Sequence, residues 1–169
     1  TDRATCWTVR AAEGGTIFVP AGPEIPFQVI DARDIGRAVV HGLTDNLTGT
    51  YNLVNEPTTW RLWLEMSREA GGNPEVEYVF ADDQVWVAEA LDEISDPRPR
   101  GALPMFLPPE YGWNFWHASN EAARRAGITF RDYRETIADT LEWRREQSYE
   151  LLAGLTPEQE RELIARWRK

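Results

Sequence analysis

Apolar residues recur along most of the chain at the three- and four-residue spacing of helices, and a few short apolar runs between them are typical of strands. The pattern predicts helices over residues 3–13, about 31–43, 59–70, 82–91, 119–126 and 133–152, with a last helix from residue 157, and strands over residues 16–19, 27–30, 49–54 and 76–80. The run GTYNLV at residues 49–54 is the clearest strand, because a glycine opens it and the sequence NEP closes it.

Two of the predicted helices follow residues that are suited to begin them. Asp31 or Asp34 can accept hydrogen bonds from the unpaired N–H groups of the second helix, and the negative charge is favourable at a helix N-terminus. Thr58 or Thr59 can do the same for the third helix. Both strand-to-helix junctions are therefore defined by capping chemistry as well as by apolar spacing.

The C-terminal helices carry stronger start signals. Asp132 and Glu135 have the spacing of a capping box before the helix of residues 133–152. Thr156 and Gln159 have the same spacing around Pro157, which suits the first turn of a helix. We therefore expect the chain to end in a capped helical hairpin.

Aromatic residues divide into a helical set and an irregular set. Trp60 and Trp63 share one face of their predicted helix and are expected to pack in the core, as is Trp143. Residues 92–117 have no periodicity, several prolines and a second aromatic cluster. The aromatic residues of that cluster are Phe106, Tyr111, Trp113, Phe115 and Trp116. Such a segment either lines an apolar pocket or forms the core of a small subdomain.

Four short strands among six or seven helices predict an α/β fold. They are too few for a self-sufficient sheet, so we interpret the chain as part of an α/β protein whose N-terminal half is missing. The length of 169 residues is that of one domain, and 42% hydrophobic residues allow a real core.

Net charge and cysteine content narrow the function. A net charge of −10 disfavours binding to nucleic acid and to anionic membranes, and no apolar run is long enough to span a bilayer. The single cysteine, Cys6, excludes an internal disulfide framework and is typical of the reducing cytoplasm. Of the 18 basic residues only Lys169 is a lysine, so the body of the chain has no lysine to act as a base.

Several familiar catalytic motifs are missing from the sequence. His41, His117 and Cys6 do not have the spacing of metal ligands, and we expect no metal site. No glycine-rich phosphate-binding loop and no G-x-S-x-G nucleophile motif occurs. His117 lies among aromatic residues and is read as a hydrogen-bonded structural or surface histidine.

The order of three motifs resembles that of a known family. The motifs are PFQVIDARDIGRAVV, which holds the second junction, then GTYNLVNEP, and finally SNEAARRAGITFR. In this order the chain resembles the C-terminal half of extended short-chain dehydrogenases/reductases, and more narrowly the NAD-dependent epimerase/dehydratase group. The resemblance covers about residues 1–146.

The resemblance implies a Rossmann-type fold and a division into three units. Residues 1–75 would be the end of the Rossmann-type region with its strand–helix junctions, and residues 49–54 a late strand of its sheet. Residues 76–132 would form the small substrate-binding subdomain, and residues 133–169 the C-terminal helices.

The family transfers hydride to or from NAD or NADP with a Tyr-x-x-x-Lys pair. None of the five tyrosines of this chain has a lysine four positions later, and no glycine-rich cofactor turn is present. The resemblance therefore implies that an N-terminal cofactor-binding half supplies both, and that this chain alone binds no cofactor and has no catalytic residue of its own.

The junction at the second helix supplies candidate substrate contacts. Phe27 and Gln28 stand where sugar-nucleotide enzymes of the family keep an arginine and an aspartate, which argues against a diphosphate substrate. Gln28 either faces a smaller substrate or is an ordinary strand residue. Asp31 either lies near the ligand or caps the helix, with Arg33 as an ion-pairing surface residue.

Four further residues complete the candidate substrate site. Arg3 and Trp7 fall on the first predicted helix, which borders the substrate cleft in the family. Trp113 and Trp116 either face the substrate or pack within the small subdomain.

These observations favour the substrate-binding portion of a bacterial, cytoplasmic NAD(P)-dependent oxidoreductase that acts on a small carbonyl or hydroxyl compound. The alternative is a non-catalytic α/β module for binding or protein interaction. An exposed edge strand would invite pairing with another chain, so a homodimer is also expected.

Overall fold

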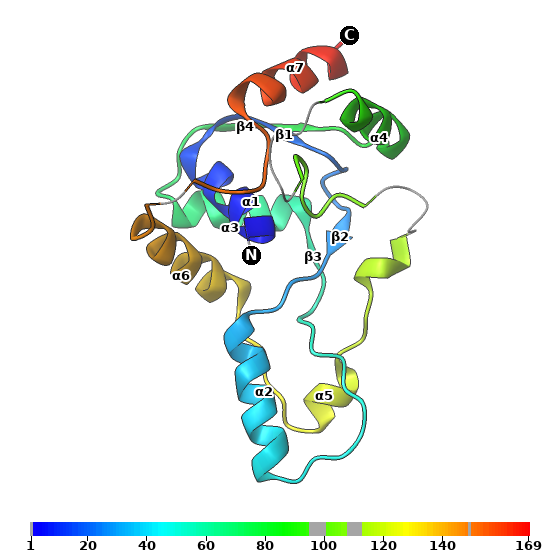
Figure 1. Ribbon diagram of the computed structural model, residues 1–169, viewed down its shortest axis with the longest axis vertical. Coiled ribbons are helices and arrows are strands. Elements are labelled where there is room, and N and C mark those ends of the chain that lie inside the picture. Colours follow the sequence, from blue (N-terminus) through cyan, green and yellow to red (C-terminus); the bar gives the residue numbers. More distant parts are fainter. Residues whose placement is uncertain (1, 95–100, 108–112, 149) are drawn as a thin grey trace.

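The protein has an α/β architecture in the computed structural model, which describes residues 2–94, 101–107, 113–148 and 150–169 (Figure 1). The elements are α1 (Asp2–Glu13), β1 (Gly15–Val19), β2 (Pro26–Phe27), α2 (Ala32–Thr44), β3 (Thr58–Thr59), α3 (Trp60–Ala70), β4 (Val76–Phe80), α4 (Gln84–Asp92), the 3-10 turn η2 (Trp113–Trp116), α5 (Glu121–Arg125), α6 (Tyr133–Arg145) and α7 (Pro157–Trp167). The predicted α/β class is confirmed, and within the described residues seven α-helices accompany four short strands.

The main body is a three-layer arrangement around β1 and β4. These strands pair in parallel, with Gly15 opposite Val76 and Val19 opposite Phe80. In Figure 1 the helices α1 and α3 lie on one side of the pair, and α7 and α4 lie on the other. The β1–β4 sheet is therefore covered by helices on both faces, as parallel sheets usually are.

A chain of aromatic rings forms much of the core beneath the sheet. The Trp7 and Trp60 rings meet edge to face with centroids 4.9 Å apart, and Trp60 lies 5.1 Å from Phe27. Phe27 in turn contacts Trp63 at 5.7 Å and Trp116 at 6.4 Å. Trp60 and Trp63 are each only 2% exposed, which confirms their predicted place in the core.

A smaller lobe is formed by α2, α5 and the segment between α2 and β3 (Figure 1). Its core is a cluster of Ala38, Ala123 and Ile128, against which Tyr51 and Leu53 pack. This cluster is separate from the main core and has only three buried members, two of them alanines, so the lobe buries little apolar surface of its own.

The predicted strand at residues 49–54 is wrong. No described strand lies beside it, and side chains satisfy part of its backbone instead. The Asn120 side-chain amide donates to the Val54 carbonyl, and the Asn52 side-chain amide donates in the other direction, to the Ser119 carbonyl. The strand-like composition is real, but a strand forms only where a neighbour offers a matching edge.

Two other predicted elements are shorter in the structure. The strand expected over residues 27–30 is limited to β2, which ends at Phe27, because Gln28 turns to contacts outside the sheet. The helix expected over residues 133–152 ends at Arg145. Beyond it the chain turns toward α1, where the Asp2 carboxylate accepts a hydrogen bond from the Leu152 N–H at 2.9 Å.

Several local predictions at helix ends can be compared directly. Asp83 caps α4. Asp132 caps α6 by accepting from the Arg134 N–H, but Glu135, its predicted partner in the capping box, forms an ion pair with Arg131 instead. The box predicted around Thr156 is present in full at the start of α7. That helix packs against β1 and not back onto α6 as a hairpin.

The prediction that Trp143 packs in the core is wrong. Its side chain lies on α6 and is 43% exposed, because α6 turns the face that carries Ile137 and Leu141 toward α1 and α3.

None of the described helices combines the length and apolar character that a membrane crossing requires.

Asp34 ties the small lobe to the rest of the protein. Its side chain is fully buried and accepts a hydrogen bond from the Arg131 backbone N–H at 2.8 Å. Arg37 reaches the same carboxylate at 2.5 Å, and the Arg131 guanidinium lies 3.3 Å away. A buried carboxylate with these partners holds α2 against the chain that leads into α6.

We expect Asp34→Ala to lower the free energy of unfolding by about 3 kcal/mol, because the Arg131 N–H and the Arg37 guanidinium lose their acceptor and the Arg131 guanidinium loses its ion pair. Asp34→Asn retains an acceptor and is expected to cost about half as much. Urea unfolding followed by circular dichroism measures both values. The exposed Glu142→Ala on α6 serves as the control and should stay within about 0.5 kcal/mol of the parent chain. An equal effect of Asp34→Ala and Glu142→Ala would contradict this account.

Candidate functional site

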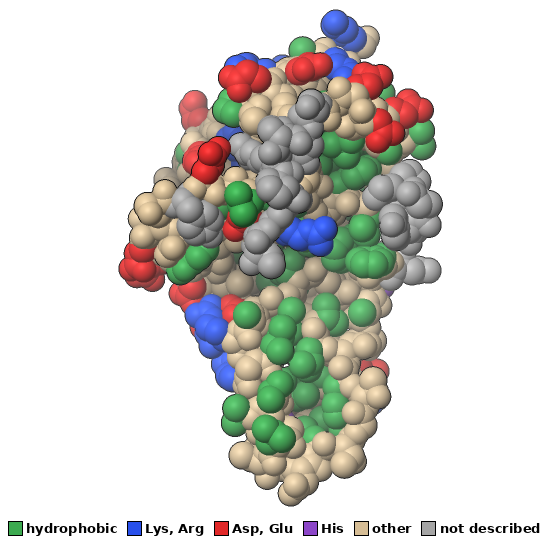
Figure 2. All heavy atoms as spheres, viewed as in Figure 1, with side chains coloured by type: hydrophobic (Ala, Val, Ile, Leu, Met, Phe, Trp, Pro, Cys, Tyr) green, Lys and Arg blue, Asp and Glu red, His purple; other side chains and the backbone are tan. Residues whose placement is uncertain are grey.

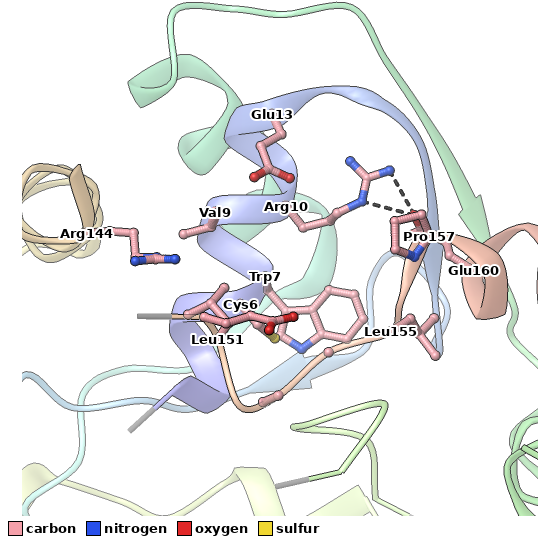
Figure 3. A pocket seen from close by; sticks show the side chains of 13 residues that line it. Cys6, Trp7, Val9, Arg10, Glu13, Arg144, Leu151, Leu155, Pro157 and Glu160 are labelled. Atoms are coloured by element: carbon pink, nitrogen blue, oxygen red, sulfur yellow. Dashed lines mark hydrogen bonds and ion pairs between the residues drawn. The ribbon is translucent and has the colours of Figure 1, made fainter. Parts of the chain in front are cut away.

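A pocket opens between α1, the end of α6 and the chain that leads into α7 (Figure 3). Its volume is about 350 Å³. The apolar wall includes Cys6, Trp7, Val9, Leu151 and Leu155, and in Figure 3 the Trp7 indole lies across its base. Because the wall combines residues from the two ends of the chain, only the folded protein contains this pocket.

An ion pair closes one side of the pocket. The Arg10 guanidinium donates to the Glu160 carboxylate through Nε at 3.0 Å and Nη2 at 2.9 Å. Glu160 is 8% exposed, and its second oxygen accepts a hydrogen bond from the Phe18 N–H at 3.1 Å. Arg10 also donates to the carbonyl oxygens of Gly14 at 2.5 Å and Thr16 at 2.8 Å. Both charges are therefore used within the fold.

These contacts lie on the outer edge of β1. The Gly15 N–H and the Val19 carbonyl bond toward β4, so by the alternation of a strand the backbone groups of Thr16 and Phe18 point the other way. Arg10 and Glu160 occupy the places that a third strand would take. The sheet therefore ends at β1 with its edge groups satisfied.

Further charged side chains stand around the pocket mouth. Glu13 on α1 and Glu150 are exposed, and half-buried Arg144 reaches in from α6 (Figure 3). Arg144 donates a hydrogen bond to the Gln147 carbonyl at 3.2 Å. An apolar base with charges of both signs at the rim suits a small organic molecule with a polar group, and the volume lies at the small end of the range for such sites.

The candidate residues on α1 separate in the structure. Trp7 is 5% exposed, lines the pocket, and donates its indole N–H to the Pro104 carbonyl at 2.6 Å. Arg3 is exposed on the same helix and does not line the pocket. Of the six candidate residues, Trp7 is the one that the structure brings to this pocket.

Gln28 and Asp31 lie at the junction before α2, away from the pocket. The Gln28 amide is buried and donates to the carbonyls of Asn55 and Ala118, each at 3.0 Å, and accepts from the Ala118 N–H at 2.9 Å. Gln28 therefore fastens two segments together. All of its amide hydrogens are used in doing so.

Asp31 is the N-cap of α2. Its carboxylate accepts from the Arg33 backbone N–H at 2.9 Å and forms an ion pair with the Arg33 guanidinium at 2.6 Å. Thr136 on α6 donates to the same group at 3.0 Å. The adjacent guanidinium holds the pKa of the Asp31 carboxyl well below its usual range. The observed geometry is that of the capping interpretation.

The two tryptophans from the irregular segment begin and end η2. Trp116 is half-buried, and its ring packs edge to face with Phe27 at 6.4 Å and with Phe115 at 5.0 Å. The side chain of Trp113 lies outside the described residues, as does Tyr111 of the predicted aromatic cluster. Trp116 is joined to Trp7 through the ring chain of the core, not through a shared pocket.

Two half-buried tyrosines differ from the activated tyrosine that hydride-transfer enzymes use. Burial raises the pKa of Tyr78 and of Tyr133 to about 12, so both phenols stay protonated near neutral pH. The Tyr133 hydroxyl donates to the Glu56 carbonyl at 2.5 Å. Within the described part of the chain, no group of three His, Cys, Asp or Glu side chains is placed to hold a metal ion. The exposed His117 belongs to no such group.

Most residues of the pocket were not predicted as a site. The capping box at Thr156 fixed the start of α7, but no local signal indicates that Glu160 meets Arg10, 150 residues earlier. A glutamate at an inward-facing position of an amphipathic helix was the one available sign that it needs a buried partner.

Comparison of the sequence with protein-family models finds no match, and comparison with curated proteins also finds none.

We expect Glu160→Ala to lower the free energy of unfolding by about 2–3 kcal/mol, because it leaves Arg10 and the Phe18 N–H without their acceptor. Glu160→Gln keeps an acceptor for the Phe18 N–H and should cost about half as much. Guanidinium chloride unfolding followed by tryptophan fluorescence gives both values.

The double variant Arg10→Met/Glu160→Leu is the matched control, since it removes both charges together. It should be more stable than Glu160→Ala, because no charge is left unpaired at the edge of β1. The single variants Arg10→Met and Glu160→Leu complete the cycle. If the double variant lost as much free energy of unfolding as these two single variants summed, the ion pair would not be a coupled unit.

The depressed pKa of Asp31 predicts how stability depends on pH. The carboxylate is charged in both states above the ordinary aspartate pKa of about 4, and its stabilising contribution is complete there. The contribution is lost as the pH falls from that value toward the lower pKa of the folded state. Because Arg33 is half-exposed, solvent screens the pair, and we expect about 1 kcal/mol.

Asp31→Asn isolates this charge, because asparagine is also a good N-cap. The variant should be less stable at pH 7 and lose less stability than the parent between about pH 5 and about pH 2.5. Urea midpoints across that range test it, and parallel pH profiles for the two chains would refute the assignment.

Proposed function

We propose that this chain is the substrate-binding portion of an NAD(P)-dependent oxidoreductase of the epimerase/dehydratase type, acting on a small carbonyl or hydroxyl compound. The observation that supports the proposal most directly is the β1–β4 sheet. It has two parallel strands with helices on both faces, whereas sheets usually have about 4–6 strands. A two-stranded parallel sheet of this kind is what we would expect of one part of a larger α/β sheet.

The two edges of this sheet differ. The β1 edge is closed by Arg10 and Glu160. On β4, the Glu75 carbonyl and the Ala81 N–H bond toward β1, so the backbone groups of Val76, Tyr78 and Phe80 face the opposite edge. Within the described residues those groups have no hydrogen-bond partner. A cofactor-binding half would add its nearest strand beside β4, because the unpaired backbone groups on that edge can hydrogen-bond to another strand.

In this proposal the chemistry is divided between the two halves. The N-terminal half supplies the NAD or NADP site and the tyrosine and lysine of hydride transfer. This chain supplies substrate selection, and the pocket over Trp7 is a cavity of suitable size with an apolar base. Neither Phe27 nor Gln28 offers the positive charge that a nucleotide diphosphate requires.

The pocket also supports a second function. A non-catalytic module that binds a small molecule would need the cavity beside Trp7 but neither a cofactor nor the open edge of β4. The two functions differ in what precedes the chain in its gene and in whether the longer product binds NAD(P).

The first test is the coding sequence upstream of Thr1 and the cofactor affinity of its product. The oxidoreductase proposal expects a glycine-rich turn and a Tyr-x-x-x-Lys motif there, and NAD or NADP binding by the longer protein. The chain of residues 1–169 alone should give no measurable heat with NAD(H) or NADP(H) in a calorimetric titration, because it has no phosphate-binding turn. Circular dichroism of the same sample establishes that the chain is folded.

Either of two results would overturn the oxidoreductase proposal. One is stoichiometric cofactor binding by this chain alone. The other is an unrelated domain or a stop codon upstream, which would favour the non-catalytic module.

A further inference from the structure

Helix α2 turns its apolar side outward. Ile35, Val39, Val40 and Leu43 are 40%, 54%, 62% and 76% exposed. The side that faces the protein carries the fully buried Asp34. This is the reverse of an ordinary surface helix, which buries its apolar stripe and exposes its charges.

The outward side of α2 is continuous and uncharged. At 100° per residue, Ile35, Val39 and Leu43 follow one another on successive turns, with Gly36 and Gly42 beside them. We define these residues together with Val40 as the α2 apolar face. The charged side chains within the helix and that of its C-cap lie around the other side, and they are Arg33, Asp34, Arg37 and Asp45.

Apolar surface continues from α2 across the small lobe. The lobe's cluster includes the partly buried Tyr51, Leu53 and Phe130. Figure 2 shows hydrophobic side chains gathered over the lower part of the molecule, where Figure 1 places α2 and α5. The α2 apolar face is therefore part of a broader patch, and such patches on soluble proteins mark interaction sites.

The sequence of the face is nearly palindromic about Val39. Gly36 and Gly42 lie three residues to either side of it, and Ile35 and Leu43 lie four residues to either side. A two-fold axis brings each residue of one copy to a symmetry-related place on the other, so an isologous contact requires a self-complementary surface. A palindromic helix face is self-complementary in an antiparallel pair.

We propose that the α2 apolar face binds the same face of a second copy of this chain, with the two α2 helices antiparallel and the two-fold axis beside Val39. In this register Ile35 of each copy lies over Gly42 of the other, and Leu43 lies over Gly36. Large side chains thus meet positions without side chains, which lets the helices approach closely.

The glycines support this partner over others. Glycine is among the poorest helix formers, yet two occur within one 13-residue helix. A Cβ added at Gly36 or at Gly42 would meet nothing within 4 Å in the single chain. The fold of one copy therefore does not require glycine at either place, whereas the antiparallel contact does.

The size of the contact sets its strength. A 13-residue helix is about 20 Å long, and two of them with their flanks bury less than the ~1,600 Å² of a standard interface. The dimer should therefore dissociate on dilution. The dimer is proposed for the chain of residues 1–169, and it requires no cofactor.

Sedimentation velocity of the chain between about 2 µM and about 200 µM tests the dimer. We expect the mass to rise from 19.4 kDa toward twice that value as concentration increases. Val39→Asp should remain monomeric throughout, because it places a charge on the two-fold axis.

Leu62→Asp on α3 is the matched control. Leu62 is 55% exposed, against 54% for Val39, and lies outside the face, so this variant should dimerise like the parent. Gly42→Leu should fold at least as well as the parent but weaken the dimer at least tenfold, because it fills the place that Ile35 of the other copy occupies. A parent chain that stays monomeric at about 200 µM, or equal effects of Val39→Asp and Leu62→Asp, would overturn the proposal.

Cysteine cross-linking tests the register. In a Cys6→Ala background, which removes the one native cysteine, Val39→Cys should form a disulfide-linked dimer under mild oxidation. Ile35→Cys should not, because residue 35 of each copy lies about one helical turn from the axis. The two cysteines would then be on opposite sides of the axis, too far apart to bond. Cross-linking of Ile35→Cys in preference to Val39→Cys would refute the antiparallel register.

Discussion

The arrangement of the main body depends on the ion pair between Arg10 and Glu160. It joins three elements that are distant in the sequence, because Arg10 lies on α1, Glu160 on α7, and both bond to the backbone of β1. Charged groups are costly to bury unless they are paired and hydrogen-bonded, and here each charge is satisfied by the other and by the strand. The pair thereby seats α7 over the sheet, ends the sheet at β1, and forms one side of the pocket beside Trp7. What looks like a C-terminal extension is thus a structural part of the α/β layer.

The same requirement, that buried charge be satisfied, explains the orientation of α2. Asp34 is held inside by Arg131 and Arg37, and Asp31 caps the helix while it pairs with Arg33. These contacts fix which side of α2 faces the protein, and they leave its apolar side in contact with solvent. The small lobe therefore has its polar anchor inside and its apolar surface outside. Charged contacts hold the lobe against the main body. Its hydrophobic surface is left exposed, and in our proposal a second chain covers it.

The candidate site shows how far local reasoning reaches. Trp7 was proposed as a substrate contact because the resemblance places the first helix beside the substrate cleft, and the structure puts its side chain in the wall of a pocket. Asp31 was recognised both as a cap and as a ligand contact, and the observed bonds are those of a cap. Gln28 could have faced a ligand, but its amide is used on Asn55 and Ala118, which no spacing in the sequence could reveal. Glu160 was missed because its partner lies 150 residues away.

The sequence by itself determined most helices, two of the strands and the cap at Thr156, because apolar spacing and capping act over a few residues. It limited the caps of α2 and α3 to two candidates each, and the structure selected Asp31 and Thr59. Only the tertiary structure decided that residues 49–54 form no strand, since strand formation depends on a neighbour that the local sequence does not name. It also decided the partners of Glu160 and Gln28 and the outward turn of the α2 apolar face. Those outcomes depend on which distant groups meet when charges and amides must be satisfied in the interior. That requirement applies to the folded chain as a whole and leaves little trace in any one segment.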